Sequence, residues 1–178
     1  MQALSGVKPQ DILVLLKLKL NDDRSWRLVD LAQELGLSVS EVSMALERAR
    51  NSGLINSEKK RVIRAALEEF ILHGLKYVYP AQPGPVCRGV PTAHSAPPIA
   101  QRIISDENDQ YVWPDAAGSL RGQAIEPLYS SVPAAARKDP KLHEMLALID
   151  ALRAGRARER GIAAEEIKKR LHGDIKKH

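Results

Sequence analysis

Cysteine and long apolar segments are scarce in this chain of 178 residues. The single cysteine, Cys87, excludes an internal disulfide and leaves no cysteine pair for a zinc site, which fits a reducing compartment. No segment reaches the ~20 apolar residues that a membrane-spanning helix requires, and the N-terminus lacks a basic start followed by an apolar run. We therefore expect a soluble, cytoplasmic protein with no membrane partner.

Motifs that bind phosphates, nucleotides or metals are also missing. The sequence contains no phosphate-binding loop, paired-carboxylate motif, dinucleotide fingerprint or metal-ligand spacing. Cys87 and His94 lie in a segment rich in proline and glycine, with no acidic or basic residue to orient the histidine. We expect no catalytic residues, no cofactor and no metal site, and hence a protein that is not an enzyme.

The formal net charge of +5 is unevenly distributed along the chain. Residues 1–56 contain seven basic and seven acidic residues, and residues 57–80 contain five and three. Residues 81–152 contain six and eight, whereas residues 153–178 contain nine and four. A nucleic-acid site near the N-terminus must therefore use a few placed side chains or borrow charge from the tail. Its binding should be salt-sensitive and of modest strength per monomer.

The segment Ser25–Ile55 has the pattern of two short helices joined by a tight turn. The first helix is predicted at about Trp26–Leu35, with Ser25 as its N-cap and apolar residues at helical spacing on one face. Gly36 should end this helix, because a residue without a Cβ atom tolerates the left-handed backbone conformation. An earlier helix that begins at Pro9 is apolar around much of its circumference and should be buried on two sides.

The second helix of the pair, at about residues 39–52, should have one buried face and one polar face. Ser38 and Glu41 fit a capping box, in which each side chain accepts a hydrogen bond from the other residue's backbone amide. The inward stripe contains partly small residues, which allow close packing: Val42, Ala45, Leu46 and Ala49. The side chains predicted to face outward are Ser40, Ser43, Met44, Glu47, Arg48, Arg50 and Asn51.

The string LAQELGLSVSEVSMALERARNSGLI, which begins at Leu31, resembles the helix-turn-helix of MarR-like winged-helix transcriptional regulators. In that family a string of the form LA..LGLS.S.VS.AL......GLI recurs, and the resemblance covers residues 8–56. It implies a sequence-specific transcriptional regulator, a repressor in the first instance, whose second helix enters the major groove of double-stranded DNA. Such regulators usually act as homodimers on paired half-sites.

The resemblance assigns DNA contacts to three groups of side chains. Arg24, Ser25 and Arg27 would touch the sugar-phosphate backbone, or else lie solvated around Trp26 as a core side chain. In the second helix, serines near the N-terminus would contact phosphates and base edges, and later residues would read the groove. This second group is Ser38, Ser40, Ser43, Met44, Glu47 and Arg48. The third group, Lys59, Lys60 and Arg61 with Arg64 beside them, would meet phosphates in the place of a wing or would form only a solvated surface.

Beyond residue 56 the sequence departs from that family. Residues 61–75 (RVIRAALEEFILHGL) predict a helix where a wing requires two strands, so we expect the wing to be absent or vestigial there. The aromatic segments at 77–79 and 111–113 predict short strands, paired with each other, or the second paired with 120–125 as a hairpin. Residues 82–98, rich in proline and glycine, predict a long loop. The expected fold is thus mainly α, winged-helix-like with a reduced or displaced wing, a small β-hairpin or sheet and a C-terminal helical extension.

The C-terminal region predicts two helices and a basic tail. Asp139 should cap a helix that begins at Pro140, whose apolar stripe needs a partner: the helix around Phe70 or the same helix of a second chain. The stripe that would form the dimer interface is Leu142, Met145, Leu146, Ile149 and Leu152. The basic tail that follows would touch DNA phosphates, bind an acidic protein partner, or remain an exposed solubilising face.

These patterns divide the chain into three functional segments. Residues 1–80 are predicted as the DNA-binding domain with its following helix, 81–131 as a Pro/Gly-rich loop with a small β element, and 132–178 as C-terminal helices for dimerisation or partner binding. An alternative function is a protein-interaction module, such as an antitoxin-like or phage-defence operon component. That module would bind a partner protein through the long loop and the basic tail.

Overall fold

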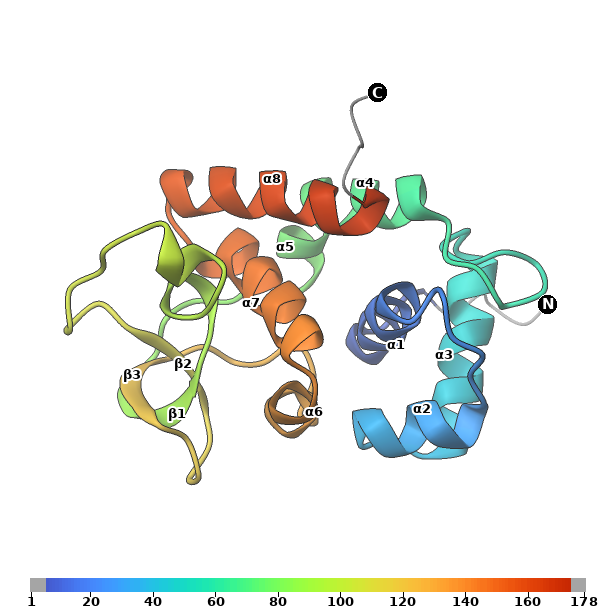
Figure 1. Ribbon diagram of the computed structural model, residues 1–178, viewed down its shortest axis with the longest axis horizontal. Coiled ribbons are helices and arrows are strands. Elements are labelled where there is room, and N and C mark those ends of the chain that lie inside the picture. The colour runs from blue at the N-terminus through green and yellow to red at the C-terminus, as the bar shows by residue number, and fades with distance from the viewer. Residues whose placement is uncertain (1–5, 174–178) are drawn as a thin grey trace. The chain divides into compact units, whose positions relative to one another are not determined.

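The computed structural model describes residues 6–173 (Figure 1). These residues form a mainly α-helical fold with a small three-stranded mixed sheet. The chain divides into two compact units: the first unit is Met1–Leu67 with Leu128–Leu142, and the second unit is Glu68–Pro127 with His143–His178. The three functional segments inferred from the sequence stay a prediction. Within the described residues, no helix is both long enough and apolar enough to cross a membrane.

Helix α1 (Pro9–Leu20) forms the centre of the first unit. It begins at Pro9 as predicted, and every residue from Asp11 to Leu18 is buried, which confirms the expected burial on more than one side. Two charged residues are included in this buried stretch and therefore require partners. Lys17 Nζ lies 2.7 Å from a Glu34 carboxylate oxygen and 2.6 Å from one of Asp139. Asp11 is paired with Arg48 of α3, as described below.

Helices α2 (Leu28–Leu35) and α3 (Val39–Asn51) form the predicted two-helix unit, and both α1 and α2 lie against α3 (Figure 1). Gly36 joins them with φ of +66°, the left-handed conformation that the sequence predicted. The prediction that Ser25 caps α2 is wrong. The N-cap is Arg27, whose side chain makes no capping hydrogen bond, so the helix begins two residues later than expected.

The N-terminus of α3 has the predicted capping box. Ser38 Oγ accepts a hydrogen bond from the Glu41 amide at 3.1 Å, and the Ser38 amide donates one to Glu41 Oε2 at 2.7 Å. The inward stripe of small and aliphatic residues is buried as predicted: Val42, Ala45, Leu46 and Ala49. α6 (Val132–Lys138) contributes to the same unit by packing against α2. Tyr129, which precedes α6 in the chain, donates a hydrogen bond to Glu41 at 3.2 Å.

A short antiparallel bridge between Ile55 and Val62 follows α3. The Asn56 amide donates to the Arg61 carbonyl and the Ile63 amide to the Leu54 carbonyl, both at 2.9 Å. These bonds close a loop over residues 56–61 before α4 (Arg64–His73) begins. The predicted helix therefore starts later than residue 61, because residues 61–63 are held by the bridge.

The second unit contains a closed barrel of three short strands, β1 (Val86–Pro91), β2 (Tyr111–Pro114) and β3 (Leu120–Ala124). β1 runs antiparallel to both other strands, and β2 and β3 are parallel to each other. The predicted hairpin of residues 111–113 with 120–125 is therefore wrong in direction, although the two segments do pair. The predicted loop at 82–98 is wrong for residues 86–91, which form β1.

Gly89 is the reason that the sequence did not predict β1 as a strand. A Cβ atom at Gly89 would lie 2.0 Å from the Trp113 carbonyl oxygen, so the strands can approach this closely only with glycine there. Glycine lowers the strand propensity of a segment and suggests a loop when it is read without its partners. The predicted strand at residues 77–79 is wrong as well, because α5 (Leu75–Val78) forms a helical turn there.

Helices α7 (Pro140–Ala154) and α8 (Ala157–His172) complete the described chain. Asp139 caps α7 as predicted, accepting a hydrogen bond from the Leu142 amide at 3.1 Å. α8 begins at Ala157 and continues through Gly161, so the second half of the basic segment at residues 153–160 is helical. Residues 174–178 of the predicted basic tail lie outside the described residues.

The stripe of α7 predicted to form a dimer interface is covered within the single chain. Its five residues, Leu142, Met145, Leu146, Ile149 and Leu152, are each at most 7% exposed. The prediction that they meet a second copy is therefore wrong. An apolar stripe at helical spacing requires a partner surface, but its pattern does not specify whether that surface belongs to the same chain.

Asp150, also on α7, holds the strands of the second unit through a buried polar network. Its Oδ2 accepts hydrogen bonds from Thr92 Oγ1 at 2.7 Å and from Trp113 Nε1 at 2.5 Å. Its Oδ1 accepts one from Arg153 at 2.8 Å. Burial raises the pKa of Asp150, and these three donors oppose that shift. The carboxylate is thus the shared acceptor for a loop, a strand and its own helix.

Candidate nucleic-acid interface

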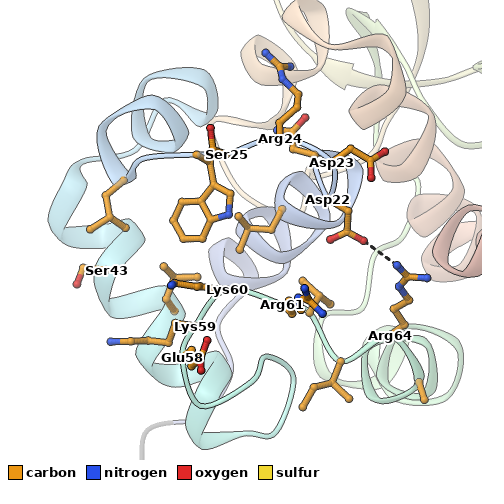
Figure 2. A pocket seen from close by; sticks show the side chains of 18 residues that line it. Asp22, Asp23, Arg24, Ser25, Ser43, Glu58, Lys59, Lys60, Arg61 and Arg64 are labelled. Carbon is orange, nitrogen blue, oxygen red and sulfur yellow. Dashed lines mark hydrogen bonds and ion pairs between the residues drawn. The ribbon is translucent and has the colours of Figure 1, made fainter.

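The first unit has a cleft of about 1090 Å³ beside α3. It lies between the turn that follows α1, the residues that precede α2, the α3 residues Ser43 and Leu46, and the loop and bridge before α4. Figure 2 shows how side chains from these segments surround it. Its lining contains three acidic residues and five basic ones, the latter being Arg24, Lys59, Lys60, Arg61 and Arg64. The cleft is therefore a net cationic surface.

Two of the five cations are already paired with carboxylates of the same unit. Arg64 lies 3.1 Å from Asp22, the pair marked by a dashed line in Figure 2. Lys59 is hydrogen-bonded to Glu47 of α3, which also lies 2.7 Å from Arg50. The hydrogen bond from Lys59 is the main cause of a lowered pKa of Glu47. The Lys59–Glu47 pair ties the loop at 56–61 to α3.

The other three cations, Arg24, Lys60 and Arg61, are exposed and have no ion-pair partner among residues 6–173. Each is therefore available to an anionic ligand such as a phosphate. Asn56 shapes the loop that carries two of them, because its Oδ1 accepts hydrogen bonds from the amides of Lys60 at 2.9 Å and Arg61 at 3.0 Å. Asparagine commonly orders a turn in this way, so Asn56 at the start of the loop is a sequence signal for this turn.

The exposed face of α3 lies next to this cleft. Ser40 is exposed, Met44 is 54% exposed, and Ser43 is partly exposed where it lines the cleft. The N-terminus of the helix is not an empty anion site, because Glu41 occupies it. The hydrogen bond from the Ser38 amide lowers the pKa of Glu41 and keeps a negative charge there. A phosphate must consequently be bound by the flanking cations rather than by the helix end alone.

Arg48 does not face outward as predicted from the sequence. It is 7% exposed, and Asp11 of α1 is fully buried beside it. The guanidinium donates two hydrogen bonds to the two Asp11 carboxylate oxygens, Nε at 2.8 Å and Nη2 at 2.7 Å. This bidentate geometry is characteristic of a structural arginine–carboxylate pair. We therefore remove Arg48 from the residues that would read DNA.

The predicted site residues thus fall into distinct groups. The structure brings Arg24, Ser25, Ser43 and the Lys59–Arg61 loop together around the cleft. Ser38 lies exposed at the N-cap of α3, and Ser40, Met44 and Glu47 lie on the helix itself. Arg27 is exposed, but both of its bonded nitrogens donate to Asp30 at 2.9 Å, which offsets its charge.

Two further residues of the cleft are Trp26 and Arg64. Trp26, expected as a core side chain, is half-buried and lines the cleft. Arg64 lines it as well, together with the other members of the predicted basic cluster, Lys59, Lys60 and Arg61.

Comparison of the chain with protein-family models, with curated proteins and with solved structures finds no match. The function must therefore be argued from the site itself.

Proposed function

We propose that this protein is a sequence-specific DNA-binding transcriptional regulator, most simply a cytoplasmic repressor, with α3 as its recognition helix. The observation that carries the proposal is the exposed, capped face of α3 beside a cleft with three unpaired cations, Arg24, Lys60 and Arg61. A helix of 13 residues is about 20 Å long, and an α-helix fits the major groove of B-DNA. The cations would then meet phosphates at the edges of that groove.

The loop at residues 56–61 takes the part of a reduced wing in this proposal. The Ile55–Val62 bridge fixes its two ends, and the Lys59–Glu47 pair fixes its position against the recognition helix. A loop held at three points presents its free cations at defined positions, which reduces the entropy lost on binding. This arrangement supports a winged-helix-like reader in which a short loop replaces a full two-stranded wing.

The number of free cations sets the expected strength of binding. If three cations each meet one phosphate, log K should fall with log salt concentration with a slope of roughly −2.7 per monomer. Specific binding by such a small contact set is weak, so we propose that the protein acts as a dimer on paired half-sites. Its dimer interface must then lie outside the covered α7 stripe.

A fluorescence-anisotropy titration with the DNA upstream of the protein's own gene, at two salt concentrations, tests the proposal. Lys60→Gln and Arg61→Gln should each weaken binding to every sequence and reduce the salt slope by about 0.9. Lys138→Gln is the matched control, because Lys138 is an exposed cation of the same unit that does not line the cleft. The proposal fails if the protein does not bind DNA at low salt, or if the control weakens binding as much as the two cleft variants.

A second candidate is the protein-interaction module. It is favoured by Arg158, Arg160 and Lys168 of α8, which are exposed and have no ion-pair partner in the described part of the chain. Such a surface fits an acidic protein partner. The long loop at residues 82–98 that this candidate also uses contains β1 at residues 86–91. Charge reversal at these three positions should abolish binding of an acidic partner and leave DNA binding unchanged.

A further inference from the structure

We propose that α3 recognises thymine, through apolar contact of Val39 and Met44 with the C5-methyl groups in the major groove. This inference rests on the proposed DNA-binding function and names the bases that it selects. The two side chains are among the large apolar groups that the fold leaves exposed, Val39 by 45% and Met44 by 54%. Both lie in the first two turns of the helix, the part that contacts base edges in helix-turn-helix proteins.

In its first two turns, the exposed face of α3 lacks the side chains that recognise purines. Guanine is read by two hydrogen bonds from arginine or lysine, and adenine by two from asparagine or glutamine. Arg48 is occupied by Asp11 in the interior, and Arg50 lies 2.7 Å from Glu47. Asn51 is the last residue of the helix, about 18 Å along its axis from Val39. The first two turns therefore present no free donor pair for a purine.

Cytosine is also a poor match for this face. Its N4 amino group would need a carboxylate acceptor, and Glu47 is the partly exposed candidate on the helix, since Glu41 is held in the capping box. That carboxylate already accepts a hydrogen bond from Lys59 and is paired with Arg50, so reading cytosine would require breaking these contacts. Ser40 and Ser43 offer hydroxyl groups, which hydrogen-bond to any base and do not discriminate strongly.

Thymine is the base whose major-groove edge fits the remaining chemistry. Its C5-methyl group is apolar, and burying it against Val39 or Met44 removes apolar surface from water on both sides. One methyl group buried in this way should strengthen binding about fourfold. The flanking cations Arg24, Lys60 and Arg61 supply the sequence-independent attraction, so the apolar pair needs to provide only the discrimination.

Deoxyuridine provides a direct test, because it pairs like thymidine and lacks only the C5-methyl group. The best duplex would be selected from a random library, and each thymine in it replaced singly by deoxyuridine. We expect one or two positions per half-site at which the replacement weakens binding about fourfold, with an unchanged salt slope. Met44→Ala or Val39→Ala should abolish the effect at its own position. Asn51→Ala is the matched control, and it should retain the full effect.

The outcomes separate this inference from the function on which it rests. Salt-dependent duplex binding in which deoxyuridine is accepted everywhere with equal affinity would overturn the thymine inference and leave the DNA-binding proposal standing. Persistence of the full deoxyuridine effect in both alanine variants would also overturn it. A complete lack of duplex binding at low salt would overturn both. Val39 and Met44 are exposed, so their alanine variants should keep the thermal stability of the parent protein, which a melting curve checks.

Discussion

Replacing Arg48 by methionine should destabilise the first unit without removing a DNA contact. The guanidinium forms a bidentate pair with Asp11, at 2.7 and 2.8 Å, between α3 and α1. Methionine fills much of the same space and carries no charge, so the main consequence is a buried carboxylate without its partner. Asp11 is fully buried, and water cannot replace the lost hydrogen bonds without a rearrangement of the helices.

The expected magnitude follows from the burial of the two groups. Removing one partner of a buried ion pair typically lowers the free energy of unfolding by about 3–5 kcal/mol. For a chain of this size, that loss lowers the melting temperature by roughly 6–20 °C. Arg50 on the same helix is the control. Its pair with Glu47 is exposed, so Arg50→Met should change the free energy of unfolding by no more than about 1 kcal/mol.

Urea unfolding followed by far-ultraviolet circular dichroism measures both variants. The double variant Asp11→Asn/Arg48→Met should recover part of the lost stability, because it removes the unpaired charge while the amide oxygen can still accept the hydrogen bond from the Lys8 amide. DNA affinity of Arg48→Met, measured well below its melting temperature, should stay within about twofold of the parent. The reasoning is refuted if Arg48→Met keeps the parent's stability and selectively loses DNA binding, since Arg48 would then be a reading residue.

Three further predictions concern buried groups and close packing. Asp150→Ala should lower the stability of the second unit by about 3–5 kcal/mol, because it removes the carboxylate that neutralises the buried Arg153 guanidinium and accepts hydrogen bonds from Thr92 and Trp113; amide hydrogen exchange in β2 measures the loss. Gly89→Ala should prevent the barrel from closing, since the new Cβ atom would meet the backbone of β2 at 2.0 Å. Gly161→Ala, a helical position with no neighbour within 4 Å, should instead stabilise by about 0.5–1 kcal/mol, and melting curves of both variants test the contrast. Burial by itself raises the pKa of Asp139 and lowers that of Lys17, but their mutual hydrogen bond and their other partners outweigh burial in both groups. The pKa of Asp139 is therefore lowered in the folded protein relative to the ordinary value of 3.8. The contribution of Asp139 to the free energy of unfolding should be complete above pH 3.8 and be lost as the pH falls through the lowered pKa. The pKa of Lys17 is above 10.5, so its contribution should be lost only as the pH rises through that higher value; the stability difference between the parent and Asp139→Asn across both pH ranges checks the sign.

The candidate site was partly predictable from the sequence. The sequence assigned the polar residues of α3 and the basic cluster at 59–61 to one candidate site. The structure brings Ser43 and this cluster to one cleft, since a capped helix followed by a short return keeps them close along the chain. Trp26 was placed in the core in one of the two alternatives for this segment, because an aromatic residue at the start of a helix gives no indication of whether a cleft opens beside it. Arg48 was assigned to the surface, because its position on the helix borders the buried stripe and the sequence does not show that Asp11 lies opposite.

The sequence by itself determined the features that depend on residues a few positions apart. The start of α1 at Pro9, the left-handed turn at Gly36 and the Ser38–Glu41 capping box all follow from local backbone geometry. Each of them involves hydrogen bonds or steric limits that operate within one turn of helix. Such interactions are nearly independent of the rest of the fold, so their patterns could be read directly.

Only the tertiary structure decided the features that join distant parts of the chain. Arg48 and Asp11 are 37 positions apart, and Thr92 and Asp150 are 58 apart. Two other features also depend on residues far apart in the chain. They are the pairing of β1 with two later strands and the burial of the α7 stripe within one chain. A buried charge or an apolar stripe requires a partner because water is excluded, but the residue's own neighbours do not identify that partner. Packing of the whole chain makes the choice, and in this protein it turned a predicted DNA contact and a predicted dimer surface into parts of the interior.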